Sequence, residues 1–87
     1  MANTKSAEKR IRQAEKRRSR NRYHRSRMRT AVKQLRELVD EGNGEGARAA
    51  LGSTLGLIDA TAQKGVIHRN AASRTKSRLT LAVNKLG

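Results

Sequence analysis

Twelve Lys and Arg side chains, but only two Glu side chains, lie between residues 5 and 29, a density suited to binding phosphate groups. Arg predominates, and its planar guanidinium can hold a phosphate through two parallel hydrogen bonds. Some of these cations recur four residues apart, as Lys16 and Arg20 do, so they would repel one another along a helix. A bound polyanion would reverse that repulsion. The run therefore predicts a contact surface for nucleic acid.

Other arrangements of reactive side chains are missing from the sequence. His24 and His68 lie far apart, the chain has no Cys, and no carboxylate pair accompanies either His. Neither a metal site nor a nucleophile with its base is therefore predicted. The Gly-rich residues 42–46 lack the Lys and the Ser or Thr of a phosphate-binding loop. We expect no enzyme activity, no cofactor and no small-molecule substrate.

Positive charge dominates the 87 residues, which hold 21 basic and 7 acidic side chains for a formal charge of +14. Residues 1–36 carry 14 basic and 2 acidic side chains, residues 37–63 carry 1 and 5, and residues 64–87 carry 6 and none. Such a surplus predicts a polyanionic partner. Tyr23 is the only aromatic residue, so the row of stacking platforms typical of single-strand binders is missing. Recognition of structured RNA by shape and phosphate contact is favoured.

Two other partners remain open from charge alone. A DNA-compacting protein would carry the same surplus, although the sequence lacks a helix-turn-helix and the sustained apolar heptads of a basic zipper. An inhibitor that binds an acidic protein surface is the second alternative. A membrane is not favoured as the partner, because no bulky apolar face lies opposite the charges and no apolar run reaches the roughly 20 residues of a membrane span.

The basic run must be carried by a long helix, expected at about residues 6–41. Ser6 is its predicted N-cap, and Gly42-Asn43-Gly44 is its predicted stop. An apolar stripe follows helical spacing from Met28 to Val39. Projected back from Met28, the same stripe falls on polar and charged side chains in the middle of the helix before it becomes apolar again, at Arg25, Asn21 and Arg18 and then Ala14, Ile11 and Ala7. We therefore expect the N-terminal half of this helix to project from the protein and to depend on its partner.

Two further helices are expected at about residues 45–63 and 68–86, with Gly65 as a left-handed cap between them. Their apolar stripes comprise Ala47, Leu51, Leu55, Ile58 and Ala62 in one helix, with Ala50, Thr54 and Thr61 beside them, and Ala71, Ala72, Thr75, Leu79, Ala82, Val83 and Leu86 in the other. Short connections favour antiparallel neighbours. The prediction is an all-α fold: a single RNA-binding domain over residues 1–87, an antiparallel three-helix bundle with a long, projecting, basic N-terminal helix.

Two separated motifs resemble a known family. The first comprises Met1-Ala2-Asn3, Lys5-Ser6-Ala7, Lys9-Arg10, Arg18, Asn21, Arg25-Ser26 and Arg29-Thr30. The second comprises Lys64-Gly65-Val66-Ile67-His68-Arg69-Asn70, followed by Ala72, Arg74, Lys76, Ser77, Arg78 and Leu79. In order and spacing, over essentially the whole chain, they resemble the bacterial small-subunit ribosomal protein S20 family.

The resemblance implies a structural constituent of the small ribosomal subunit, cytoplasmic and located in the ribosome, with few protein contacts. It implies direct, phosphate-mediated binding to small-subunit ribosomal RNA, whose folding and assembly the protein would stabilise. From the match and from the charge of the same stretches, the expected RNA-binding residues are Lys5, Ser6, Lys9, Arg10, Lys16, Arg17, Arg18, Asn21, Arg22, Arg25, Arg29, Lys64, His68, Arg69, Asn70, Arg74, Lys76 and Arg78. For His68, capping of the third helix and phosphate contact both remain open, and Tyr23 could stack on a base or simply lie on the helix surface.

Overall fold

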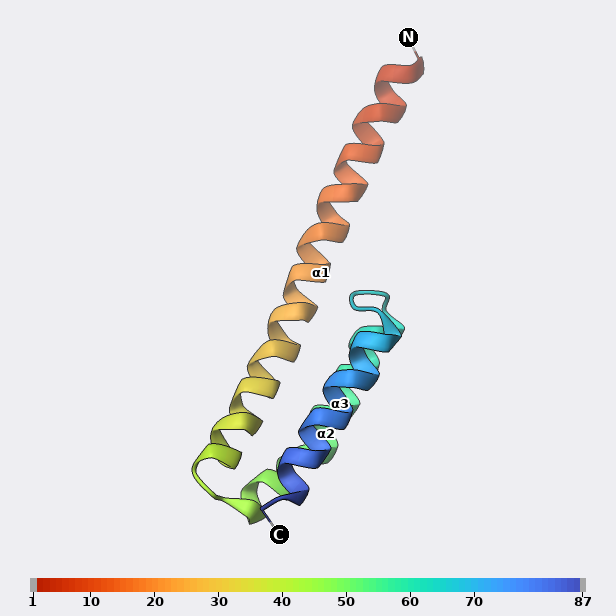
Figure 1. The fold of residues 1–87 in the computed structure, drawn as a ribbon. Helices are drawn as coiled ribbons and strands as arrows, with labels where there is room; N and C mark the ends of the chain where they lie inside the picture. The colour runs from red at the N-terminus through yellow and green to blue at the C-terminus, as the bar shows by residue number, and fades with distance from the viewer. Residues whose placement is uncertain (1, 87) are drawn as a thin grey trace.

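The computed structural model describes residues 2–86, which form three α-helices in the order α1, α2 and α3 (Figure 1). The helix α1 spans Ala2–Asp40, α2 spans Gly44–Gln63 and α3 spans Arg69–Asn84. Consecutive helices run in opposite directions (Figure 1). No strand occurs between residues 2 and 86. The all-α prediction, with three antiparallel helices, is confirmed.

Of the two predicted ends of α1, only the C-terminal one is confirmed. At the C-terminal end, Gly42 adopts a φ of +74°, a left-handed conformation that Gly accepts most readily, and the helix stops as predicted. At the other end the helix extends to Ala2. The prediction of Ser6 as the N-cap is therefore wrong, because residues 2–7 contain neither Gly nor Pro to stop the helix there.

The other helix ends have local causes. Asn43 caps α2, since its side-chain oxygen accepts a hydrogen bond from the backbone N–H of Gly46 at 2.9 Å. Gly65, with a φ of +76°, turns the chain after α2, as predicted. His68 caps α3, because its Nδ1 accepts a hydrogen bond from the backbone N–H of Asn70 at 3.0 Å. The two short turns thus set the antiparallel arrangement.

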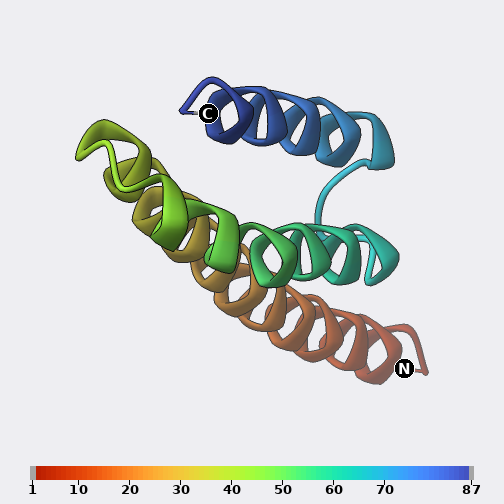
Figure 2. The ribbon, with the colours of Figure 1, turned by 90° about the horizontal axis from the view of Figure 1, so that it is seen from below.

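The middle helix, α2, packs against both of the others, whereas α3 touches α1 only lightly (Figure 2). All three helices contribute to one small apolar core, which comprises Leu35, Ala47, Ile58, Ala72, Leu79 and Val83. These residues all belong to the apolar stripes expected from the sequence. Only the last third of α1, from Met28 to Val39, therefore contributes to the core or packs against it.

The buried face of α2 is rotated from the expected one. Thr54 and Thr61 are buried, while Leu51 and Leu55 are only half-buried. Each Thr hydroxyl donates a hydrogen bond to the carbonyl oxygen four residues earlier, at 2.9 Å and 2.7 Å respectively, so neither hydroxyl is left unsatisfied. In α3, Ala71 is exposed, and its assignment to the core was wrong.

The N-terminal half of α1 projects beyond the other two helices (Figure 1). Every side chain from residue 4 to residue 20 is exposed. The molecule measures 65 × 20 × 15 Å, and its radius of gyration is 17.6 Å, against about 12 Å for a compact chain of this length. This confirms the long, projecting N-terminal helix. Its first half contributes nothing to the core.

Candidate nucleic-acid interface

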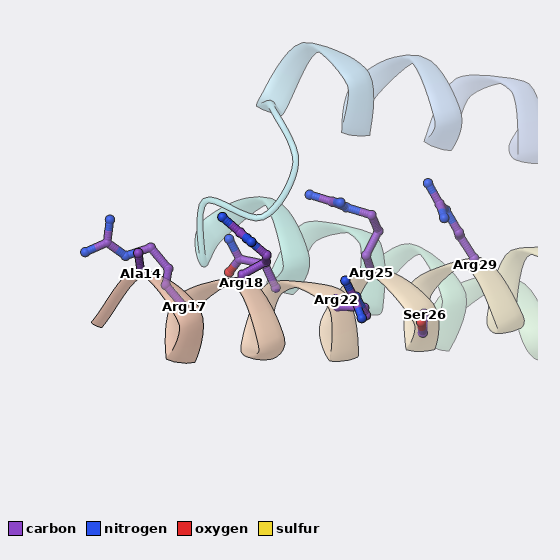
Figure 3. A pocket seen from close by; sticks show the side chains of 8 residues that line it. Ala14, Arg17, Arg18, Arg22, Arg25, Ser26 and Arg29 are labelled. Carbon is purple, nitrogen blue, oxygen red and sulfur yellow. The ribbon is translucent and has the colours of Figure 1, made fainter. Parts of the chain in front are cut away.

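A shallow, arginine-rich groove runs along one face of α1 near the point where that helix leaves the bundle (Figure 3). It is lined by Ala14, Arg17, Arg18, Asn21, Arg22, Arg25, Ser26 and Arg29. Their three- and four-residue spacing places them on one side of the helix. Arg25 and Arg29 extend toward the side on which α3 lies (Figure 3). The lining contains no carboxylate, so it concentrates positive potential where a phosphate backbone could bind.

Arg25 connects α1 to the turn between α2 and α3. Its Nη2 donates a hydrogen bond to the carbonyl oxygen of Val66 at 3.4 Å. The neighbouring His24 is half-buried. Burial first, and then the positive charges of Lys64, Arg27 and Arg20, lower the pKa of His24 below its usual value of 6.5. The hydrogen bond to Val66 shows that the two sequence motifs meet at this junction.

The turn between α2 and α3 adds a second group of polar side chains to this junction. Lys64 and His68 in the turn, and Arg69 and Asn70 at the start of α3, are all exposed. Of the two roles left open for His68, the structure shows capping, and the cap occupies Nδ1 only. Because a neutral imidazole that accepts at Nδ1 carries its proton on Nε2, His68 can still donate a hydrogen bond to a phosphate.

Two predicted site residues on α3 lie away from the junction. The Nζ of Lys76 pairs with Oδ1 of Asp59 at 2.7 Å, on the open groove between α2 and α3. Arg78 lines a different groove, between α1 and α3, where Asp40 is also found. The structure therefore does not bring Lys76 together with the groove on α1. Arg74, the remaining predicted residue on α3, is exposed.

The projecting half of α1 carries predicted residues on more than one side. Lys5, Ser6, Lys9, Arg10 and Lys16 are exposed and make no side-chain hydrogen bond within residues 2–86. At about 100° per residue, Lys5, Lys9 and Lys16 fall on the side of the helix opposite the arginine groove. Positive charge therefore surrounds this half of α1 and is not confined to one face.

Sequence reasoning did not include Arg27 among the site residues. Its Cζ lies 5.8 Å from the centroid of the Tyr23 ring, within the range of a cation–π contact. The ring of His24 meets the same Tyr ring edge-on, with centroids 5.2 Å apart. Tyr23 lies on the helix surface, 58 % exposed. The four-residue spacing of Tyr23 and Arg27 was the available signal for their contact.

The part of the chain that the structure describes contains no group of three or more His, Cys, Asp or Glu side chains placed to hold a metal ion. None of the helices there combines the length and the apolar character required to cross a membrane.

A model of the family described as Ribosomal protein S20 matches residues 2–84. The chain belongs to the ribosomal protein S20 family. Three S20 proteins named Small ribosomal subunit protein bS20 are similar to it over its full length. Those of Trichlorobacter lovleyi and Citrifermentans bemidjiense are 53% and 52% identical over 87 residues, which cover all of both chains. That of Acidithiobacillus ferrooxidans is 52% identical over 87 residues and 96% of its own length.

Membership of the S20 family confirms the resemblance drawn from the two motifs. The structure also shows how the two separated motifs of this S20 chain are related in space. The first motif lies on α1 from Ala2 to residue 30, with Met1 outside the described residues, and the second starts at residue 64. The hydrogen bond from Arg25 to Val66 nevertheless joins them. Side chains distant in sequence are thus presented at one junction.

Proposed function

We propose that this chain is a structural constituent of the small ribosomal subunit and that it binds small-subunit ribosomal RNA directly, through phosphate contacts. Similar proteins at 52–53% identity carry the name Small ribosomal subunit protein bS20. The S20 family is a family of structural ribosomal proteins, and the chain is not an enzyme. Its proposed location is the cytoplasm, within the ribosome. By holding RNA segments together, it would stabilise the folding of that RNA during subunit assembly.

The observation that carries this proposal is the arginine groove beside the turn between α2 and α3. Five Arg side chains line the groove, and no acidic side chain does. Lys64 and Arg69 extend the positive surface from the other side of the hydrogen bond between Arg25 and Val66. A double-stranded RNA presents closely spaced phosphates and few readable base edges, so a groove of this composition suits its backbone.

The shape of the molecule supports a large partner. The exposed half of α1 buries none of its side chains against the protein from residue 4 to residue 20. Exposed large apolar side chains are few among the described residues, namely Ile11, Tyr23 and Leu81, and they do not form a patch. Few protein contacts are therefore proposed, with RNA covering most of α1.

The proposed RNA contacts fall into three groups. Lys5, Ser6, Lys9, Arg10 and Lys16 lie on the projecting helix; Arg17, Arg18, Asn21, Arg22, Arg25 and Arg29 line the groove; Lys64, His68, Arg69, Asn70, Arg74, Lys76 and Arg78 lie on the turn and α3. For Lys76, RNA binding would require exchange of its Asp59 partner for a phosphate. We expect Lys76 to contribute less than the groove residues.

The proposal is tested by the salt dependence of binding to a small-subunit ribosomal RNA fragment. The slope of log K against log salt should be about −0.7 to −0.9 for each phosphate neutralised. Substituting Arg18, Arg22 and Arg29 together by Gln should make the slope shallower by about 2. The matched control removes three other exposed charges, Lys33, Arg48 and Lys85, and should leave the slope nearly unchanged. A flat salt dependence, or equal effects of the two triple variants, would argue against the proposal.

The two alternative partners are separated by further measurements. Equal affinity for a DNA duplex and for the ribosomal RNA fragment would favour a DNA-compacting protein. A protein complex that survives nuclease treatment would favour binding to an acidic protein surface. Sedimentation of the chain with small ribosomal subunits on a sucrose gradient is the outcome expected from the proposal.

A further inference from the structure

Tyr23 lies on the side of α1 that faces away from the arginine groove. At about 100° per residue, its position is nearly opposite that of Arg25. The residue is 58 % exposed, and it is the only Tyr, Phe or Trp in the chain. The ring therefore adds little to the packing of the bundle and is accessible to a binding partner.

Neighbouring side chains orient the Tyr23 ring without covering it. The guanidinium of Arg27 lies over the ring, with Cζ 5.8 Å from the centroid. The imidazole of His24 meets the ring at an interplanar angle of 70° and a centroid distance of 5.2 Å. The preferred geometries of cation–π and edge-to-face contacts restrict the ring in the absence of a ligand. A preoriented ring loses less conformational freedom when a flat ligand stacks on it.

Cations accompany Tyr23 on its own side of the helix. Lys16 and Arg20 precede it by seven and three residues, and Arg27 follows it by four, which are the spacings of one helical face. An exposed aromatic ring among cations is the combination that binds unpaired nucleotides: the ring stacks on the base while the cations hold the flanking phosphates. Paired bases in an RNA helix are not available for such stacking, whereas bulged bases are.

We infer that Tyr23 and Arg27 form a stacking site for one unpaired base of the bound RNA. The inference rests on the proposed RNA-binding function and adds to it a second, base-contacting surface on the side of α1 opposite the groove. Stacking on the ring requires its π-face and not its hydroxyl. Phe should therefore replace Tyr23 with little loss of binding, whereas Leu should not.

The absence of other aromatic residues makes the test direct, because all intrinsic tyrosine fluorescence of the full chain comes from Tyr23. Two RNA hairpins serve as probes, identical except that one has a single bulged adenosine in its stem. We expect the bulged hairpin to quench the fluorescence strongly and the fully paired hairpin to quench it weakly. Equal quenching by both, or none by either while both bind, would overturn the inference and leave the proposed function standing.

Affinity measurements on three variants complete the test. Tyr23→Leu should bind the bulged hairpin about tenfold more weakly and lose the preference over the paired one, while Tyr23→Phe should keep it. Ile11→Ala is the matched control, since Ile11 is also 58 % exposed on the projecting helix, and it should bind like the unsubstituted chain. A Tyr23→Leu protein that retains the preference would refute the stacking site. If the unsubstituted chain binds neither hairpin but binds the small-subunit ribosomal RNA fragment, the stacking site is refuted and the proposed function stands. If it binds none of the three RNAs, both are overturned.

Discussion

The guanidinium of Arg25 and the carbonyl oxygen of Val66 lie 3.4 Å apart, although 41 positions separate the two residues in sequence. Among the described residues, this is the side-chain hydrogen bond that joins α1 to the rest of the fold. It lies where the apolar contacts of α1 have already ended, N-terminal to Met28. The hydrogen bond therefore adds one polar contact between α1 and the rest of the bundle beyond the apolar ones.

Replacing Arg25 by Ala should lower the free energy of unfolding by about 0.5 kcal/mol, the lower end of the range for a hydrogen bond, because this one is long and only partly buried. Urea denaturation followed by circular dichroism measures the change. Arg22→Ala is the control, since it removes the same charge from an exposed position one turn away. Identical midpoints for the two variants would show that the hydrogen bond contributes nothing.

Replacing Gly52 or Gly56 by Ala should stabilise the protein, by about 0.5–1 kcal/mol each. Both glycines lie inside α2, and a Cβ added at either would meet no atom within 4 Å. The controls are Gly42→Ala and Gly65→Ala, which should destabilise because both glycines have φ near +75°. Thermal denaturation measures all four. A lower melting temperature for Gly52→Ala would indicate that α2 needs flexibility at that position.

Replacing His68 by Ala should cost about 1 kcal/mol of stability through loss of the α3 cap. His68→Asn should restore most of that stability, because Asn also caps helices well. The pair of variants separates capping from RNA contact. If His68 also binds phosphate through Nε2, the Asn variant should fold normally and still bind RNA more weakly. Equal RNA affinity for the Asn variant and the unsubstituted chain would assign His68 a capping role alone.

Stability should fall as the pH drops below about 6.5, in part because of His24. Its pKa is lowered in the folded state, by burial and then by Lys64, Arg27 and Arg20, so the unfolded chain binds its proton first on acidification. The unfolded state is therefore favoured as the pH falls from the unfolded pKa to the folded pKa, and this loss is absent above 6.5. Melting temperatures at about pH 7.5 and pH 5.5 should differ less in His24→Gln. An unchanged difference would exclude His24 as a source of the pH dependence.

Without RNA, the backbone amides of residues 4–20 should exchange hydrogen much faster than those of α2. No tertiary packing supports this part of α1, and like charges such as Lys16 and Arg20 repel each other. Hydrogen exchange followed by mass spectrometry measures the difference, and bound RNA should slow the exchange of these amides. Equal protection of this segment and α2 in the RNA-free protein would show that the projecting helix is stable by itself.

Local sequence signals predicted the helices and most of the core. Gly42 and Gly65 follow helix ends as expected, because Gly adopts the left-handed conformation readily whatever surrounds it. Leu35 and Leu79 lay on the buried stripes because helical periodicity is a local property. The face of α2 was less predictable. That helix packs between two others, and their positions decide that Thr54 and Thr61 are buried more deeply than Leu51.

The candidate interface was predictable in composition but not in arrangement. The positive charge and the arginine spacing along α1 can be read from residues 5–29 alone. No local pattern, however, shows that Arg25 would reach Val66 or that Lys76 would pair with Asp59. Both contacts depend on how the antiparallel helices are placed, which is a property of the whole chain.

The absence of core contacts between residues 4 and 20 changes how a mutational scan of this protein should be interpreted. In most small proteins, a loss of function on substitution can reflect either misfolding or a damaged site. Here, substitutions that preserve helix propensity should leave the bundle intact, since none of these side chains is buried in it. A growth defect caused by such a substitution would therefore report on assembly into the ribonucleoprotein rather than on folding. The substitutions that this segment accepts are therefore decided by its binding partner and not by the packing of the bundle.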